Sequence, residues 1–306
     1  MRHKRKLLIM LFAFITMVIF PIEADAATPA QVKSVKVKEV KKSYIGWWGE
    51  GNKKTRAFYA CKELSWKRVK GASGYVIYRY GNASKTWHKI KTIKKVSTTK
   101  YIIPELIKGY RVKIRVAAFQ ETSTGRVYGK ESKAVSFTPK KNYELEGVIK
   151  TKKYNPVEST RYYRFMSEDA FVIQNGYRKK KGIKPLKWDE SLYEMGKIRG
   201  KEIYNKFSHT RPNGAFSTTV LDDYYKREVS SDIPLLLMKF RENIAFGYVY
   251  PYEVMKGWKN SIGHYHSLLM KNLRYGAIAC YRRNEESYWV SMFSEPQIDE
   301  LVNSIE

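Results

Sequence analysis

The chain has 306 residues, of which 43% are hydrophobic, and a formal net charge of +29 at pH 7. This length is enough for two domains that each bury a core. Basic residues concentrate in the first half: residues 28–150 hold 29 Lys and Arg against 8 Asp and Glu, whereas residues 151–306 hold 25 against 19. Cys61 and Cys280 are too few for a disulfide-rich scaffold, so we expect two buried thiols, with an interdomain disulfide as the alternative.

Residues 1–26 have the features of a secretory signal peptide. A positive segment at residues 2–6 precedes an apolar run at residues 7–20, and Ala-Asp-Ala at residues 24–26 is a small-x-small cleavage site. The apolar run is shorter than the roughly 20 residues that a membrane helix needs, which favours cleavage over retention as an anchor. We therefore expect a secreted, extracellular protein with no transmembrane segment after cleavage.

The basic first half suggests the kind of partner. An exported protein does not ordinarily meet nucleic acid, so we expect no nucleic-acid partner. An anionic surface, such as cell-wall polymer or membrane headgroups, is the expected counter-charge, and association with the cell wall would follow. The alternative is that lysine is simply abundant in the source organism and serves solubility.

Short strands with turn residues between them fill residues 28–139. The clearest strand covers residues 110–119, where Tyr110, Val112, Ile114 and Val116 alternate with cations. Further strands are predicted at residues 32–40, 75–80, 87–93 and 128–137, with a Gly, Trp and Lys-rich loop at residues 46–54. The absence of a helical period predicts an all-β sandwich.

This first half resembles a fibronectin type III module. The resemblance is carried by Leu-x-Trp at residues 64–66, Val-Lys-Gly-Ala-Ser-Gly-Tyr-Val-Ile-Tyr-Arg at 69–79, the strand at 110–119 and Gly-Lys-Glu-Ser at 129–132. It covers residues 28–139 and implies an immunoglobulin-like sandwich that serves as a spacer or adhesion unit. No catalytic residue is assigned to it.

Residues 140–164 are polar and proline-marked, so they are predicted to be a linker to a domain at residues 165–300. Ser167 is expected to cap a first helix that runs to Gly182, and Asp189 to cap a second that runs to about Asn205. A further helix is predicted at residues 252–260, with late strands at 275–282 and 288–293. A polar segment with an apolar run at residues 235–238 is expected to precede that helix.

His209, His264 and Glu242 are the best candidates for a polar pocket in this second half. Two histidines and one carboxylate with an open position are a recognised zinc arrangement, but no short ligand spacing such as His-Glu-x-x-His occurs. The alternatives are that each histidine is a structural residue and that Glu242 caps a helix. His266 is expected to point away from His264.

Two serines beside these histidines are conceivable nucleophiles. Neither Ser208 nor Ser261 lies in a Gly-x-Ser-x-Gly elbow, and capping a turn is the more common role of such a serine. We therefore expect neither to be a nucleophile.

The same half resembles the CAP superfamily of cysteine-rich secretory, antigen 5 and pathogenesis-related proteins, and most of all its bacterial SCP-like extracellular branch. Five phrases carry the resemblance in order: Asn-x-x-Arg at residues 175–178, Pro-Leu-x-Trp-Asp at 185–189, Phe-Ser-His-Thr-Arg-Pro-Asn-Gly at 207–214, Glu-Asn-Ile-Ala-x-Gly at 242–247 and Trp-x-Asn-Ser-x-Gly-His at 258–264. The resemblance implies an α+β fold, a three-layer α-β-α sandwich.

The resemblance also implies a cavity lined by two histidines and two acids, in which the histidines can hold a divalent metal, usually Zn²⁺. These positions fall on His209 and His264 as metal ligands and on Glu242 and Ser261 as pocket residues. Ser261 stands where the family has its second acid, which weakens a two-carboxylate acid/base scheme.

The sequence leaves three functions open. The leading expectation is a secreted, non-enzymatic binding protein with a metal-capable His/Glu pocket and a small or lipidic ligand. The first alternative is a zinc-assisted hydrolase of peptide or cell-wall polymer, in which Glu242 is the general base and Ser261 a hydrogen-bond donor. The second is an adhesion protein that acts through the basic β-sandwich.

Overall fold

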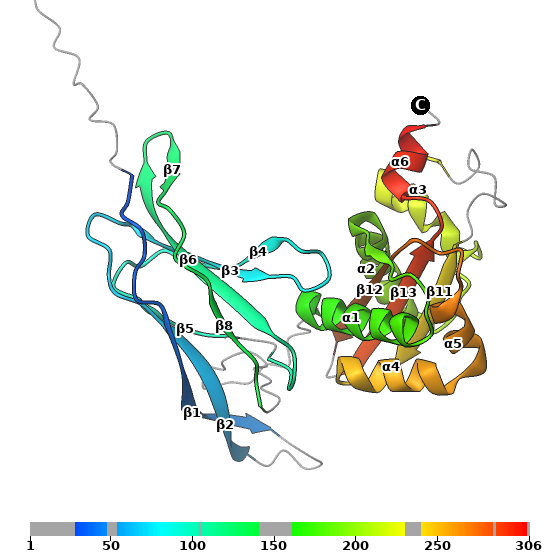
Figure 1. Cartoon of the computed structure of the whole chain (residues 1–306), viewed down its shortest axis with the longest axis horizontal. Coiled ribbons are helices and arrows are strands. Elements are labelled where there is room, and N and C mark those ends of the chain that lie inside the picture. Colours follow the sequence, from blue (N-terminus) through cyan, green and yellow to red (C-terminus); the bar gives the residue numbers. More distant parts are fainter. Residues whose placement is uncertain are drawn as a thin grey trace, which may run out of the picture.

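The computed structural model describes residues 28–47, 54–103, 106–140, 161–229, 240–283 and 286–304. The expected signal peptide, most of the expected linker, the centre of the loop at 46–54 and the apolar run at 235–238 lie outside these residues. Residues 28–140 form the N-terminal module and residues 161–304 the C-terminal module (Figure 1).

The N-terminal module consists of two antiparallel sheets. The first has the order β1-β2-β5, and the second the order β4-β3-β6-β7, with β8 also paired to β6. The strands are β1 (Lys36–Trp47), β2 (Lys54–Ser65), β3 (Gly74–Tyr80), β4 (Trp87–Ile93), β5 (Lys100–Ile102), β6 (Val112–Thr122), β7 (Gly125–Tyr128) and β8 (Val135–Phe137). Leu64, Tyr75 and Ile114, from β2, β3 and β6, share one apolar core, so the two sheets pack as a sandwich.

The predicted alternation is confirmed from Val112 to Val116, because Val112, Ile114 and Val116 are buried in the core of the sandwich. Tyr110, expected on the same strand, lies before β6. The expected last strand at 128–137 is instead two short strands, β7 and β8, that both pair with β6. The opening strand begins at Lys36 rather than at residue 32.

The C-terminal module is built on a sheet with the order β10-β12-β13-β11, to which β9 adds by pairing with β12. Its strands are β9 (Arg161–Tyr162), β10 (Lys187–Trp188), β11 (Arg241–Phe246), β12 (Tyr275–Arg283) and β13 (Glu286–Ser294). Strand β12 is buried on both faces: Ala277 and Ala279 belong to one apolar cluster and Ile278 and Cys280 to another.

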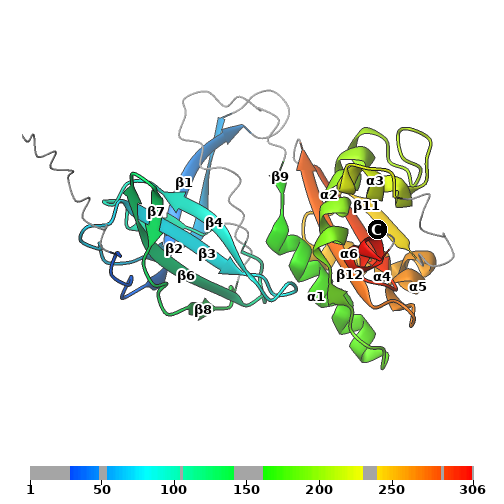
Figure 2. The same cartoon turned by 90° about the horizontal axis from the view of Figure 1, so that it is seen from above.

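Helices cover both faces of this sheet (Figure 2). They are α1 (Arg164–Lys180), α2 (Glu190–Asn205), α3 (Val220–Tyr225), α4 (Pro251–Asn260), α5 (Ile262–Leu269) and α6 (Ile298–Asn303), with a 3₁₀ turn at Ser217–Thr219. Buried residues of α2, α3 and α6 pack on the Ala277 face, and those of α1, α4 and α5 on the Ile278 face. The sheet therefore lies between two helical layers. No helix in the described part of the chain is both long and apolar enough to cross a membrane.

The expected cap of α2 is confirmed, since Asp189 accepts the N–H of Leu192 at 2.9 Å. The expected cap of α1 is wrong: the helix begins at Arg164, and Ser167 lies inside it. The hydroxyl of Ser167 donates to the carbonyl of Tyr163 and accepts the N–H of Cys280 at 2.9 Å, so it ties α1 to β12.

Cys280 is buried in the sheet. The side chain of Cys61 lies outside the described part of the structure.

The modules meet where the β3–β4 hairpin reaches helix α1 (Figures 1 and 2). The buried carboxylate of Glu168 accepts the backbone N–H groups of Ala83 and Ser84 at 2.8 and 3.2 Å and the Ser84 hydroxyl at 3.0 Å. Glu168 thus acts as an anion held by a loop of the other module. A side chain at Gly81 would collide with both Glu168 carboxylate oxygens, so only glycine permits this approach.

A cation–π contact and apolar packing extend the junction beyond Glu168. The guanidinium of Arg79, which is 1% exposed, lies 4.0 Å from the ring centroid of Phe165 on α1. Ile107 of the N-terminal module is buried in the same cluster as Met166 and Ala170 of α1. The core of the C-terminal module therefore continues into the N-terminal module.

Candidate functional site

His209 lies in a tight loop that follows helix α2. The loop turns back on itself through a hydrogen bond from the N–H of Arg211 to the carbonyl of Ala215, 2.9 Å long. The hydroxyl of Ser208 accepts the N–H of Thr210 at 3.0 Å, so its expected turn-capping role is confirmed. The imidazole of His209 is 58% exposed. The loop thus fixes the backbone of His209 and leaves its ring at the surface.

Glu242 is the second residue of β11, which forms one edge of the sheet. The alternative that Glu242 caps a helix is wrong, because residues 241–246 pair with β13 as a strand. Its side chain is only 3% exposed. A carboxylate so deeply placed needs hydrogen-bond donors around it.

Arg199 supplies most of those donors. Its side chain, which is fully buried on α2, donates from Nε to Oε2 of Glu242 at 2.8 Å and from Nη2 to Oε1 at 3.1 Å. Nη1 donates to Glu202 at 2.5 Å, and Nη2 also donates to the carbonyl of Ser208 at 2.9 Å. The guanidinium therefore neutralises Glu242 and fixes the loop that carries His209.

His209 and Glu242 are in direct contact. Nδ1 of His209 lies 3.0 Å from Oε1 of Glu242. Because an ionised carboxylate only accepts hydrogen bonds, the hydrogen in this contact belongs to Nδ1. In the neutral ring Nε2 then keeps its lone pair, which is the tautomer that a carboxylate imposes on a metal-binding histidine.

His264 lies near the start of α5. Its carbonyl accepts the side-chain amide of Asn243, the neighbour of Glu242 on β11, at 3.2 Å. Burial lowers the pKa of His264, and the nearby His209 lowers it further. Glu242 contacts His209 and its neighbour Asn243 contacts the main chain of His264, so both histidines lie beside the start of β11 although they are 55 positions apart in the chain.

The remaining sequence candidates lie around α5. Ser261 joins α4 to α5 through main-chain hydrogen bonds to Trp258 and from Tyr265, and its hydroxyl does not cap α5. Tyr265 packs edge-on against Tyr177 at 6.2 Å, and His266 is exposed on the same helix. Nothing in the described structure links Ser261 or His266 to Glu242.

Two exposed aromatic rings flank the site. Phe207, two residues before His209, and Phe246, at the end of β11, are 47% and 55% exposed. Their ring centroids lie 5.0 Å apart in an edge-on arrangement. An exposed apolar pair therefore lies next to the loop that carries His209.

The described residues offer no metal site with three protein ligands, since no group of three or more His, Cys, Asp and Glu side chains among them has the geometry of a metal site. Glu242 does not fit as a ligand, because both its oxygens accept hydrogen bonds from Arg199 or His209. A divalent ion would be bound by His209 and His264, with Glu242 orienting His209.

Sequence reasoning missed Arg199 as a site residue. The available signal was a cation in the apolar stripe of α2, on the same face as Leu192, Met195 and Ile203, all of which are buried. A charge in a buried stripe requires a counter-charge from elsewhere in the fold.

Residues 173–293 match the model of the CAP, or cysteine-rich secretory protein, family. This part of the chain is a CAP domain. The match includes all four of the sequence candidates, His209, Glu242, Ser261 and His264. The N-terminal module lies outside it.

A bacterial relative shares the CAP domain. The chain is 28% identical over 126 residues to the "Uncharacterized protein YkwD" of Bacillus subtilis (strain 168). The aligned region is 40% of this chain and 44% of that protein, so the chain spans less than half the length of the curated relative it matches.

Solved structures with partial likeness also come from bacteria. An extracellular protein containing an SCP domain from Bacillus anthracis has a TM-score of 0.37 at 14% identity, with 77% of this chain and 82% of that chain covered. A cysteine-rich secretory protein from Staphylococcus aureus has a TM-score of 0.34 at 13% identity, with 87% of each chain covered. An outer surface protein from Borrelia burgdorferi has a TM-score of 0.35 at 17% identity, over 42% of this chain and 90% of that chain. TM-scores this low do not support an inference about the function of this chain.

Proposed function

We propose that the protein is secreted and acts by binding, with the His209, His264 and Glu242 pocket of the CAP domain as its binding centre. In this proposal the two imidazoles hold a divalent metal ion such as Zn²⁺. Coordination positions that the protein leaves open are filled by the ligand or by water.

The observation that carries the proposal is the engagement of Glu242. Oε2 accepts Nε of Arg199, and Oε1 accepts both Nη2 of Arg199 and Nδ1 of His209. A general base must reach a water molecule with a free lone pair within hydrogen-bond distance. Glu242 is 3% exposed and already holds three donors, so it suits a positioning role.

This arrangement disfavours the zinc-hydrolase alternative. Catalytic zinc sites take three protein ligands and an activated water, whereas this site offers two imidazoles. Ser261, the residue that would have assisted Glu242, bonds through its main chain in the described structure. Binding without turnover is the simpler use of these residues.

The exposed rings of Phe207 and Phe246 support a ligand with an apolar part. Exposed aromatic side chains beside a polar pocket are typical of ligand-binding surfaces. A small or lipidic ligand would match this site: its polar group would bind the metal, and its apolar part would contact the two phenylalanine rings.

The N-terminal module is proposed to be a fibronectin type III-like sandwich that holds the protein to an anionic, wall-like surface. Its two-sheet architecture supports the first part of this proposal. Its exposed cations support the second: in the described part of the module they include Lys67, Lys70, Lys89, Lys91, Lys94 and Lys95, whereas the exposed acids are Glu39 and Glu121. Such a surface attracts polyanions.

Two measurements test the proposed function. Calorimetric titration with Zn²⁺ should show binding by the wild type that falls at least about tenfold in His209→Ala and in His264→Ala, since each removes one of two ligands. His266→Ala is the matched control, because this exposed histidine lies on the same helix as His264 and should bind as the wild type does.

Turnover is measured on the same proteins with labelled wall polymer and a labelled peptide mixture. We expect no zinc-dependent product. Product that disappears in His209→Ala would overturn the non-enzymatic proposal, and equal zinc binding by all four proteins would overturn the metal site.

A further inference from the structure

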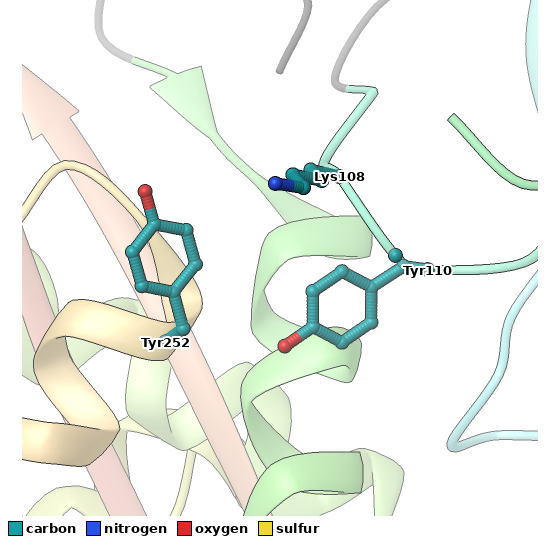
Figure 3. Close-up of a pocket in the computed structure, with 4 residues that line it drawn as sticks. Lys108, Tyr110 and Tyr252 are labelled. Atoms are coloured by element: carbon teal, nitrogen blue, oxygen red, sulfur yellow. The ribbon is translucent and has the colours of Figure 1, made fainter. Parts of the chain in front are cut away.

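A pocket lies at the junction of the two modules. It has a volume of about 610 Å³ and is lined by Lys108, Gly109 and Tyr110 of the N-terminal module and Tyr252 of the CAP domain. Figure 3 shows the two phenol rings and the Lys108 side chain around one shared space. This volume lies within the range of sites that bind small molecules, and such sites are frequent at domain interfaces.

The N-terminal wall of the pocket is a tight turn. The N–H of Tyr110 donates to the carbonyl of Ile107 at 3.3 Å, and Gly109 has a φ of +86°, as the third position of a type II turn requires. Ile107 is buried in the apolar cluster of the CAP domain. The turn is therefore anchored to the CAP domain. Lys108 is one of its two central residues, and Tyr110 is its last residue.

Two aromatic rings line the pocket, one from each module. Tyr110 comes from the turn and Tyr252 from α4, and the carboxylate of Asp169 and the ring of Tyr177, both on α1, lie close to Tyr110. Tyr252 is 42% exposed and stacks on Tyr250 with ring centroids 5.3 Å apart. Burial raises the pKa of Tyr110, so its hydroxyl remains a hydrogen-bond donor at neutral pH.

Cations border these rings. Lys256 is exposed on α4, one turn beyond Tyr252 and on the same side of the helix. Lys259, a further turn along, lies 5.6 Å from the ring centroid of Tyr177. With Lys108 on the opposite wall, exposed lysines lie on both sides of the pocket, while the buried carboxylate of Asp169 on α1 lies close to Tyr110.

We propose that this junction pocket binds an acidic saccharide, a sugar unit that carries a carboxylate or a phosphate. Tyrosine rings offer flat apolar faces for the C–H face of a pyranose and hydroxyls for its polar edge. The bordering lysines, among them Lys108 and Lys256, attract the anionic group. The site is preformed, because Glu168 and Ile107 fix the two modules to each other.

The junction pocket is distinct from the histidine pocket. Its lining residues, Lys108, Gly109, Tyr110 and Tyr252, include none of His209, Glu242 and His264. Loss of one site should therefore leave the other intact.

The test is ligand-observed NMR titration of the chain with both modules against three probes. N-acetylmuramic acid carries a carboxylate, N-acetylglucosamine 6-phosphate carries a phosphate, and N-acetylglucosamine is their neutral counterpart. We expect at least one acidic sugar to bind at least about tenfold more tightly than the neutral sugar, as charge-assisted contacts imply.

Tyr252→Ala should weaken that binding by about tenfold or more. The matched control is Tyr128→Ala, since Tyr128 is 45% exposed and packs against one other ring, but lies on β7. His209→Ala should bind the acidic sugar as the wild type does. The proposal is overturned if no acidic sugar binds, if the neutral sugar binds equally well, or if Tyr252→Ala, folded by circular dichroism, binds like Tyr128→Ala.

Discussion

Arg199 and Glu242 form a two-point ion pair inside the CAP domain, with contacts of 2.8 and 3.1 Å between a fully buried guanidinium and a 3% exposed carboxylate. These contacts occupy the carboxylate of Glu242, so it is not available as a general base. Glu242 instead orients the imidazole of His209.

Breaking this pair should destabilise the CAP domain strongly. Arg199→Met leaves Glu242 buried without its main partner, and the cost is expected to be about 3–5 kcal/mol. Replacing both residues, as Arg199→Met with Glu242→Leu, should recover much of the loss, because the buried carboxylate that lost its partner is then also removed. Urea unfolding of the two single variants and the double variant measures this. A double variant that loses the sum of the two single effects would contradict a coupled pair.

The junction should lose stability in acid through Glu168. Burial alone would raise the pKa of Glu168, but hydrogen bonds from His88 and Arg164 outweigh it and lower the pKa to about 2. A lowered pKa means stability that is present above the unfolded value, near 4.5, and is lost as the pH falls toward 2. The amount is on the order of 3 kcal/mol.

Comparing unfolding at several pH values between 6 and 2 in the wild type and in Glu168→Gln checks this. The variant should be less stable at pH 6 and should lose less stability on acidification. Parallel curves for the two proteins would show that Glu168 does not carry the acid sensitivity.

Gly81→Ala should weaken the contact between the modules. The added methyl group would collide with the carboxylate of Glu168, and overpacking of this kind costs about 1–3 kcal/mol. Gly176→Ala is the matched control, because Gly176 is inside α1 with open space around it and should gain helix propensity. Limited proteolysis and thermal unfolding should rank Gly176→Ala at or above the wild type and Gly81→Ala below it. The reverse order would contradict the close approach.

Attachment through the N-terminal module should depend on salt. Retention on an anionic wall-like polymer is expected to fall steeply between about 0.05 and 0.5 M salt, since charge interactions are then screened within a few ångströms. Lys89→Glu/Lys91→Glu, on the exposed side of β4, should reduce retention at low salt. Lys179→Glu/Lys180→Glu changes the charge equally at exposed positions of α1 and should have less effect. Retention that is independent of salt, or equal in both variants, would exclude this role.

Local signals were predictable from the sequence. The Asp189 cap and the extent of α2 follow from side-chain capping and a helical period, and both need only neighbours in the chain. The strand at β6 follows in the same way from its alternation. These features depend little on the rest of the fold.

Contacts made between distant segments were not predictable. Glu168 has one local partner, Arg164, but the backbone N–H groups that it accepts are about 85 residues upstream in the β3–β4 hairpin. Arg199 could be recognised as an unusual buried cation, but its pairing with Glu242 across 43 positions is made by the fold. Helix α3 was missed because it is six residues long, too short for a period to be visible.

The most direct test of the central claim is nitrogen-15 NMR of the histidine rings during titration with Zn²⁺. The account predicts that zinc shifts Nε2 of His209 and a ring nitrogen of His264, while Nδ1 of His209 stays protonated against Glu242 and His266 does not respond. Zinc shifts confined to His266, or no shift at His209 and His264, would contradict a binding centre built on these two imidazoles.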